Sequence, residues 1–371
     1  MNAHPLAIRP AAETPASAAI SIGIVRGGAG FDSLRDAWDG LFHTSAAPHQ
    51  LFQSHAFLRT WQASHPDAGE TIIVTATSGD RLVAVLPLVE RRKFGVRRLR
   101  PMGLPVAQFS DMLVDAEAQP DAIEPLWNAV AALGADLLEL PRLRADSPLW
   151  RLREGAMVTQ VATSPFACLA RRVEEDGPGQ QVYSPRDRSN FRRRVRRLEE
   201  LGRVEWKTAT HGDESVELAR QAIAMKRRSL KAARVFATAL TAPSFEDFFL
   251  RAATDPACGL LVSAIELDGR PIAIDLSFLN KGVGFGHVMA MEPHARKQGV
   301  GTLLVHHAFA SAKRQGAGMF DLLSPADAFK MQHADGVTQT ESRVYPFTRR
   351  GRLFARALHG VALPAARALL R

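Results

Sequence analysis

The apolar and polar positions along the first half of the chain predict a mixture of helices and strands. Residues 71–77 and 82–89 are rich in β-branched side chains and flank Ser78-Gly79-Asp80, a turn signal, so they predict a β-hairpin. Residues 31–44 and 54–64 carry apolar positions at helical spacing and predict two helices. Similar patterns predict strands at 21–25, 95–99, 112–114 and 137–140, and a helix at 123–133.

The second half of the chain repeats this style. Strands are predicted at 204–208, 260–267, 271–279, 283–291 and 319–323, and helices at 186–203, 214–230, 244–253 and 301–315. The order helix, helix, strand, turn, strand occurs in residues 31–89 and again in residues 214–279. This repetition indicates an internal duplication of architecture without matching residues.

Length and composition are those of a globular protein with two domains. The chain has 371 residues, of which 46% are hydrophobic and 23% charged. It contains no apolar run of about 20 residues, and its first residues lack the apolar region of a signal peptide. Cys168 and Cys258 have no CxxC neighbour, so no metal site is predicted, and two reduced thiols fit a cytoplasmic protein.

The net charge of +9 makes an anionic partner plausible. Eight arginines crowd residues 186–203, which we interpret first as a charged helix between domains, then as a wall for an acidic acceptor, and only last as a contact for nucleic acid. The basic, amphipathic residues 351–371 are expected to pack on their own domain. Peripheral binding to the anionic inner face of a membrane is the alternative for this segment.

The segment with the most specific chemistry follows the strand predicted at 283–291. Gly299 and Gly301 stand in the run Arg296-Lys297-Gln298-Gly299-Val300-Gly301-Thr302, directly before a helix with apolar Leu303 and Leu304. Glycine lets backbone amides approach a ligand closely, and a helix N-terminus offers free N–H groups to an anion. The strand before and the helix after this turn favour a phosphate or pyrophosphate site over a ligand-free turn. The glycines at 282, 284 and 286 have no following helix, which excludes a Rossmann loop.

At these residues the sequence resembles the GNAT acetyltransferases, whose cofactor motif is (Gln/Arg)-x-x-Gly-x-(Gly/Ala). The resemblance implies a site for acetyl-CoA or another acyl-CoA as co-substrate, with the pyrophosphate on the amides of residues 298–302 and the pantetheine arm along the edge of residues 288–291. The cofactor-binding residues it implies are Val288, Met289, Ala290, Met291, Arg296, Lys297, Gln298, Gly299, Val300, Gly301 and Thr302.

A narrower resemblance covers most of the chain. The arginine-rich residues 189–199, Phe320-Asp321-Leu322-Leu323, Phe329-Lys330, residues 52–61 and Leu86-Pro87-Leu88 are similar to the CelD-like branch of GNAT proteins, named for cellulose biosynthesis and related to the FemABX-type transferases. The resemblance implies an α/β (α+β) fold of two tandem GNAT-like domains, with mixed, mostly antiparallel sheets flanked by helices. We therefore expect a leader at 1–20, an N-terminal domain without the cofactor motif at 21–170, a linker at 171–185, a C-terminal domain with the acyl-CoA site at 186–350 and a basic helix at 351–371.

Two residues are candidates for the base that takes the proton of the acceptor. Asp275 stands in an apolar strand, where an unpaired carboxylate is costly, and His287 has the side chain that titrates nearest neutrality. Each has a structural alternative, an ion pair with an arginine for Asp275 and a packing role for His287. Lys330 and Arg192 are the candidates for binding the substrate, and Asp321 is expected to be structural. The chain's two tyrosines, Tyr183 and Tyr345, fall outside residues 324–336, where many GNAT enzymes carry a general acid. The sequence therefore assigns no residue as the general acid, and water is the alternative.

The predicted function is transfer of an acetyl or acyl group to an amine or hydroxyl. The resemblance points to a small molecule or a glycan precursor of the cell envelope or an exopolysaccharide as the acceptor. The alternatives are a FemABX-type transferase that uses aminoacyl-tRNA and a non-catalytic module that senses CoA or serves as a scaffold.

Overall fold

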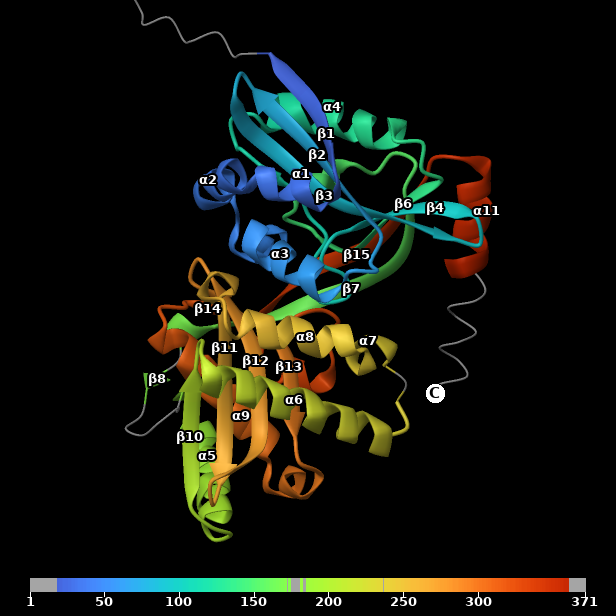
Figure 1. Cartoon of the computed structure of the whole chain (residues 1–371). Helices are drawn as coiled ribbons and strands as arrows, with labels where there is room; N and C mark the ends of the chain where they lie inside the picture. The colour runs from blue at the N-terminus through green and yellow to red at the C-terminus, as the bar shows by residue number, and fades with distance from the viewer. Residues whose placement is uncertain (1–18, 172, 175–180, 183–184, 236, 360–371) are drawn as a thin grey trace, which may run out of the picture.

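The computed structural model of the chain describes residues 19–171, 173–174, 181–182, 185–235 and 237–359 (Figure 1). Within these residues, thirteen strands form one mixed sheet with the order β1-β2-β3-β4-β6-β15-β7-β14-β13-β12-β11-β10, and β5 pairs with β3. The predicted α/β class is therefore confirmed, and the sheets expected for the two halves are joined edge to edge. Most of the leader, Tyr183 and residues 360–371 lie outside the described residues.

The first half of the chain builds most of the upper part of Figure 1. Its strands are β1 (Ile20–Arg26), β2 (Glu70–Ser78), β3 (Arg81–Lys93), β4 (Val96–Pro101), β5 (Leu113–Val114), β6 (Leu137–Arg144) and β7 (Met157–Cys168). Its helices are α1 (Gly27–Ser33), α2 (Arg35–Ser45), α3 (His55–Ser64) and α4 (Gln119–Ala132). β2 and β3 are apolar along most of their length because helices cover both of their faces, α1 to α3 on one side and α4 on the other.

The second half continues the sheet and covers it in the same way. Its strands are β10 (Val204–Ala209), β11 (Leu260–Leu267), β12 (Arg270–Asn280), β13 (Val283–Met291), β14 (Met319–Asp321) and β15 (Gly336–Pro346), and β8 (Val173–Glu174) pairs with β9 (Gln181–Val182) apart from the main sheet. Its helices are α5 (Pro185–Glu199), α6 (Asp213–Ala232), α7 (Thr238–Thr241), α8 (Pro243–Ala252), α9 (Val300–Arg314), α10 (Ala328–Met331) and α11 (Arg349–Ala357). Helices α6 and α8 cover one face of β11–β13, and α5 and α9 cover the other.

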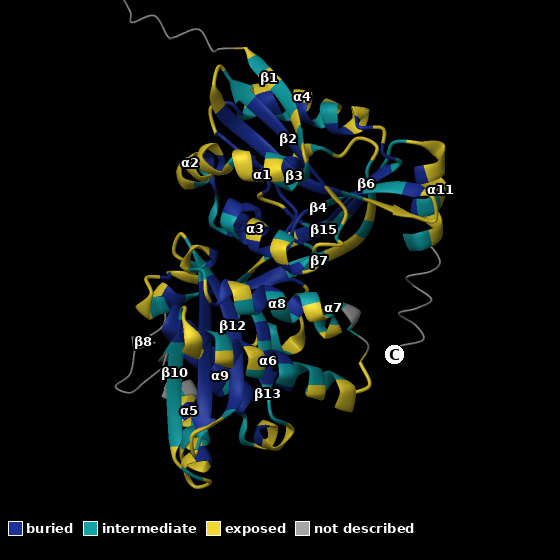
Figure 2. Cartoon of the chain, in the orientation of Figure 1, coloured by how far each residue is buried: buried dark blue, intermediate teal, exposed yellow. Residues whose placement is uncertain are grey.

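Strands from one half of the chain pair with strands from the other half. β15, the last strand among the described residues, lies between β6 and β7 and is antiparallel to both. β7 in turn pairs with β14 through Phe166 and Asp321, so the first half contributes the neighbour of a strand in the second half. The sheet is therefore continuous across the border, and its strands are mostly buried (Figure 2).

One hydrophobic core also spans both halves. Phe52 and Phe57, which belong to the first half, lie 5.8 Å and 5.5 Å (ring centroids) from Phe285 and Phe278 of the second half. Phe57 also contacts Phe248 on α8, with 4.9 Å between ring centroids. Aromatic rings bury a large apolar area, so this cluster fixes how the halves are oriented to each other.

Most predicted elements are present, with three differences. The helix predicted at 31–44 is broken at Leu34 into α1 and α2, which brings Phe31 and Trp38 edge to face at 5.5 Å in the core. The strand predicted at 319–323 ends at Asp321. β7 and β15 were not predicted at all. The described part of the basic C-terminal segment, α11, packs on β15, β4 and β6.

Candidate functional site

The site is a gap in the sheet between two parallel strands. β13 and β14 pair only from Val283 to Phe285 on β13, opposite Met319 to Asp321 on β14, and then diverge. A cavity of about 680 Å³ opens where they separate. Its walls come from the second half of β13, the turn before α9, the face of α9, residues 322–330 and the C-terminal part of α6. Strands that diverge leave backbone N–H and C=O groups without a partner, which suits them to bind an extended polar ligand.

A β-bulge at the start of this gap controls which side chains face which side of the sheet. Leu276 on β12 pairs with Val288, but the next residue, Ser277, pairs with Gly286, so His287 is an extra residue on β13. His287 packs among Phe245, Phe249 and Phe278, on the face covered by α6 and α8. Asp275 points to the opposite face, because its neighbours Ile274 and Leu276 belong to the core on the α6–α8 side. The two predicted base candidates thus line one cavity from opposite faces of the sheet.

The predicted cofactor turn forms the end of the cavity on the α9 side. Gly299 has a φ of +76°, in the left-handed region that favours glycine, and it is the residue directly before α9. A Cβ on Gly301 would lie 3.0 Å from Cε of Met291, so a side chain at this position would crowd the cavity. The 15-residue helix that begins at Val300 directs its free N–H groups and the positive end of its dipole toward this space.

Positive charge surrounds this helix end. The side chain of Arg194, from α5, lies over Gly299, since a Cβ built on Gly299 would be 2.9 Å from its Nε. Within the described residues, the Arg194 guanidinium has no hydrogen bond or ion pair. Arg296 lines the cavity and donates from Nη2 to Oγ of Ser229 on α6, at 2.6 Å. A helix N-terminus with arginines beside it is suited to phosphate groups.

Asp275 is the carboxylate of the site whose protonation is tuned toward neutral pH. It lies opposite Met289 in the β12–β13 register and is almost fully buried. Burial raises the pKa of Asp275 to about 7, although the hydroxyl of Ser277 donates a hydrogen bond that stabilises the charged form. No arginine pairs with it in the described part of the chain, which removes the structural alternative considered from the sequence. A carboxylate with a pKa near 7 can act as a general base under physiological conditions.

His287 is neutral near pH 7. Burial lowers its pKa to about 4, and the hydrogen bond to the carbonyl of Val106 opposes this only in part. With Nε2 donating to that carbonyl at 2.6 Å, the ring has a fixed tautomer, and Nδ1 has no hydrogen-bond partner in the described chain. His287 is therefore a neutral acceptor rather than a base tuned to pH 7.

Lysine 330 lines the cavity, as the sequence predicted, and a second lysine joins it. Lys330 donates from Nζ to the carbonyl oxygens of Leu323 at 2.8 Å and Pro325 at 3.0 Å. Lys226, on α6, donates to the carbonyl of Met289 on β13 at 3.0 Å. Burial is the main cause that lowers the pKa of each lysine. Lys226 was missed from the sequence, although it stands three and four residues after Ile223 and Ala222, on the buried face of α6.

The first half contributes one residue to the cavity, Gln108, which was also missed. Its Nε2 lies 2.9 Å from Nε2 of His287 and donates to the carbonyl of Val106 at 3.1 Å. Arg142 holds this loop by donating to the carbonyl oxygens of Gln108 and Ala107. No sequence motif marks this loop, because its position depends on the packing between the halves.

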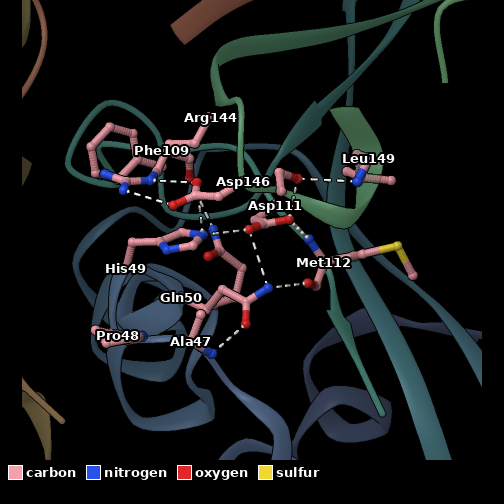
Figure 3. Close-up of polar contacts among 12 residues, drawn as sticks. Ala47, Pro48, His49, Gln50, Phe109, Asp111, Met112, Arg144, Asp146 and Leu149 are labelled. Carbon is pink, nitrogen blue, oxygen red and sulfur yellow. Dashed lines mark hydrogen bonds and ion pairs between the residues drawn. The ribbon is translucent and has the colours of Figure 1, made fainter. Parts of the chain in front are cut away.

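A buried polar network anchors the other end of the same loop (Figure 3). Asp111 accepts hydrogen bonds from Ser147 at 2.6 Å and from the side chain of Gln50 at 3.1 Å, and it contacts Nε2 of His49 at 3.0 Å. Gln50 donates also to the carbonyl of Met112 at 2.7 Å. Since every member has partners, the network is rigid and fixes the loop that carries Gln108.

Asp321 is structural, as expected. Its carboxylate pairs with Arg144 at 2.7 Å and accepts from Ser164 at 2.6 Å and from the backbone N–H of Leu323 at 2.8 Å. The carbonyl of Leu323 in turn accepts the hydrogen bond from Lys330. Asp321 therefore shapes the wall of the cavity that holds Lys330.

Some of the other predicted site residues line the cavity and others do not. Met289, Ala290, Met291 and Thr302 line the cavity together with Arg296, Gly299 and Gly301. Four predicted cofactor residues do not line it, namely Val288, Lys297, Gln298 and Val300. Arg192 is exposed on α5, away from the lining. Tyr345 is buried and donates to the carbonyl of Leu152, so it does not face the cavity.

Comparisons with known proteins agree with this arrangement. Residues 185–331 match the family model of an acetyltransferase (GNAT) domain. Curated protein sequences gave no significant match. Three solved structures are similar over 88% of the chain: FemX, with 10% identity, 98% of its own chain covered and a TM-score of 0.57; L-PGS from Bacillus licheniformis, with 13%, 96% and 0.55; and a tandem GNAT protein from the clavulanic acid biosynthesis pathway, with 12%, 99% and 0.53.

The match to a GNAT acetyltransferase domain is thus confined to residues 185–331, which make up less than half of the chain. The likeness to the solved structures extends the fold to two tandem GNAT-like halves, which confirms the fold class predicted from the sequence. The CelD-like branch and the predicted domain boundaries stay predictions. Among the described residues, none of the helices could span a membrane, and no three His, Cys, Asp or Glu side chains are grouped so that they could hold a metal ion.

Proposed function

We propose that the protein transfers an acyl group from acyl-CoA to an amine or hydroxyl of a small acceptor. The observation that carries this proposal is the left-handed Gly299 before α9, at the mouth of the gap between β13 and β14. Phosphates would bind at the N–H groups of residues 299–302, with Arg194 and Arg296 beside them, and the extended arm of the cofactor would lie against the unpaired edge of β13. The cofactor supplies a thioester whose carbonyl carbon the acceptor attacks.

Asp275 is the base in this proposal. For an amine acceptor, the C–N bond forms as the C–S bond breaks, the proton of the amine passes to the Asp275 carboxylate directly or through water, and the CoA thiolate takes a proton from water. Asp275 is preferred to His287 because its pKa is about 7, whereas a pKa of about 4 makes His287 a weak base. His287 would instead accept a hydrogen bond at Nδ1.

A second candidate is transfer from an aminoacyl-tRNA, as in the FemABX-type transferases that the sequence resembles. It is favoured by the arginines on the exposed side of α5, next to the cofactor turn: Arg186, Arg192, Arg193, Arg196 and Arg197. Basic side chains on one helix face suit a phosphate backbone. The cytoplasm as location and a glycan precursor as acceptor are part of the proposal for either donor.

The test is calorimetric titration of acetyl-CoA into the wild-type protein and into Gly301→Trp. We expect binding to the wild type and its loss in Gly301→Trp, since the indole would fill the space before α9. Gly40→Trp is the matched control, because Gly40 is exposed on α2 and a Cβ there meets nothing within 4 Å. Circular dichroism checks the folding of both variants. A wild-type protein that binds neither acetyl-CoA nor longer acyl-CoAs would contradict the proposal and favour the aminoacyl-tRNA donor.

A further inference from the structure

Two lysines approach the cavity from its two walls without an acidic partner. Lys226 reaches it from α6 and Lys330 from α10, and in the described part of the chain neither ammonium forms an ion pair. Lys226 uses one of its three N–H donors, on Met289, and Lys330 uses two, on Leu323 and Pro325. Three donors therefore remain available on two ammonium groups that line one space.

No carboxylate of the cavity forms an ion pair with either lysine in the described part of the chain, although the charges of Asp327 and Asp321 act to raise the pKa of Lys330. Asp275 projects from the opposite face of the sheet, and Asp327 is exposed and accepts a hydrogen bond from the backbone N–H of Lys330 at the start of α10. Burial is the main cause that lowers the pKa of Lys330, and the charge of Lys226 adds a smaller effect in the same direction. Arg296 adds to burial in lowering the pKa of Lys226. Partly buried cations that repel one another are unfavourable unless an anion binds between them.

Lys226 approaches the cavity from the face of the sheet opposite the N-terminus of α9. Lys226 belongs to α6, which covers the face of the sheet on which His287 lies. Gly299 and Thr302 lie at the N-terminus of α9, on the other face. A cofactor that crosses the gap from the α9 side presents its thioester toward the α6 side. The space beside Lys226, His287 and Gln108 is then where the acceptor must lie.

We infer that Lys226 and Lys330 together bind a compact anionic group, a carboxylate or a phosphate, on the acceptor. This inference rests on the proposed function and adds the class of acceptor, a molecule whose nucleophile and negative charge are a few bonds apart. The ammonium groups hold the anion, His287 Nδ1 and the side chain of Gln108 contact the polar groups around it, and the nucleophile is left to face Asp275 across the gap.

The test uses inorganic phosphate and acetate as probes, compared with chloride at matched ionic strength, and measures the melting temperature of the full chain. We expect one or both probes to stabilise the wild type and Gly301→Trp, and not to stabilise Lys226→Gln/Lys330→Gln. Lys231→Gln is the control, because Lys231 is an exposed lysine on the same helix. Lys226→Arg/Lys330→Arg keeps both charges and should retain at least part of the stabilisation, which separates loss of charge from loss of folding.

Two binding results would overturn the inference. One is the absence of any stabilisation of the wild type by either probe. The other is stabilisation that disappears in Gly301→Trp and persists in the double glutamine variant, because the anion would then lie at the N-terminus of α9.

Acetyl-CoA calorimetry on the same variants separates this inference from the proposed function. We expect the double glutamine variant to bind acetyl-CoA within about threefold of the wild type. If it loses acetyl-CoA binding, the lysines hold the cofactor and the inference is wrong. If the wild type binds the anions and not acetyl-CoA, the anion site stands and the acyl-CoA donor is wrong.

Discussion

Arg144 and Asp321 form a buried ion pair of 2.7 Å that joins the two halves of the molecule. Arg144 ends β6 of the first half, and Asp321 ends β14 of the second, immediately before the wall of the cavity. The same carboxylate accepts a hydrogen bond from the backbone N–H of Leu323, and the carbonyl of Leu323 accepts a hydrogen bond from Lys330. The geometry of the cavity wall at Lys330 thus depends on a charge that lies in the other half of the chain.

Asp321→Asn should lower the free energy of unfolding by about 3 kcal/mol, because it leaves Arg144 buried with a weaker partner. The loss is at the lower end of what a broken buried pair costs, since Arg144 also pairs with Asp146 at 2.9 Å. Urea denaturation measures it. Arg26→Gln breaks the exposed pair with Glu70 and should cost at most about 1 kcal/mol. Equal losses in the two variants would show that the Arg144–Asp321 pair contributes no more than a surface pair.

The rate of acyl transfer should rise with pH up to about 7 and then level, because Asp275 acts as a base only when it is deprotonated. Acetyl-CoA consumption with any acceptor found in an amine screen, followed from pH 5 to 9, gives the profile. Asp275→Asn should lower kcat by at least about 100-fold and leave acetyl-CoA binding intact. A profile with the same inflection in Asp275→Asn would assign the titrating group elsewhere.

Asp275 should also make stability depend on pH. Burial raises its folded-state pKa from 3.8 to about 7, so the folded state favours the protonated form. The wild type is therefore most stable relative to Asp275→Asn below about pH 4 and loses this advantage as the pH rises to about 7. At about 1.4 kcal/mol per pKa unit, the change amounts to about 4 kcal/mol. Urea denaturation of both proteins at several pH values measures the difference. In a Ser277→Ala background, the stability should still fall as the pH rises, because burial of Asp275 is unchanged.

His287 should have the opposite effect. Its folded-state pKa falls from 6.5 to about 4, so the folded state resists protonation. The stability that the wild type has relative to His287→Gln should be fully present above about pH 6.5 and be lost as the pH falls through about 4, by about 3 kcal/mol in all. Glutamine can still donate to the carbonyl of Val106, which makes it the matched replacement. A difference that does not vary between pH 7 and 4 would mean that the ring binds a proton as readily in the folded protein as in the unfolded chain.

The sequence predicted the elements whose patterns are local and missed those that depend on distant partners. β2, β3 and β11 to β13 are apolar runs bounded by turns, and each was predicted within a few residues. β15 reads Gly-Val-Thr-Gln-Thr-Glu-Ser-Arg-Val-Tyr-Pro, which has no apolar alternation over most of its length. Its polar residues are satisfied by β6 and β7 of the other half, so nothing nearby in the sequence marks it as a strand.

The same distinction applies to the site. Gly299 and Gly301 could be found because a turn, a helix start and a motif coincide within a few residues. Lys226 could have been found by helical phase, since it follows Ala219 and Ala222 on the buried face of α6, but the adjacent Arg227 and Arg228 give it the appearance of an ordinary charged surface. Gln108 reaches His287 across 179 residues of sequence, a distance that no local pattern spans.

The place of β15 also bears on how the protein is made. During synthesis, β6 and β7 leave the ribosome long before residues 336–346, and until then both strands present open hydrogen-bonding edges to each other and to other chains. The first half to be translated is therefore completed late, because it awaits a strand that follows the rest of the sheet in the sequence. Chaperones that shield exposed strand edges would act on this nascent chain during that interval, and a message truncated before residue 336 would yield two unfinished halves rather than one finished domain.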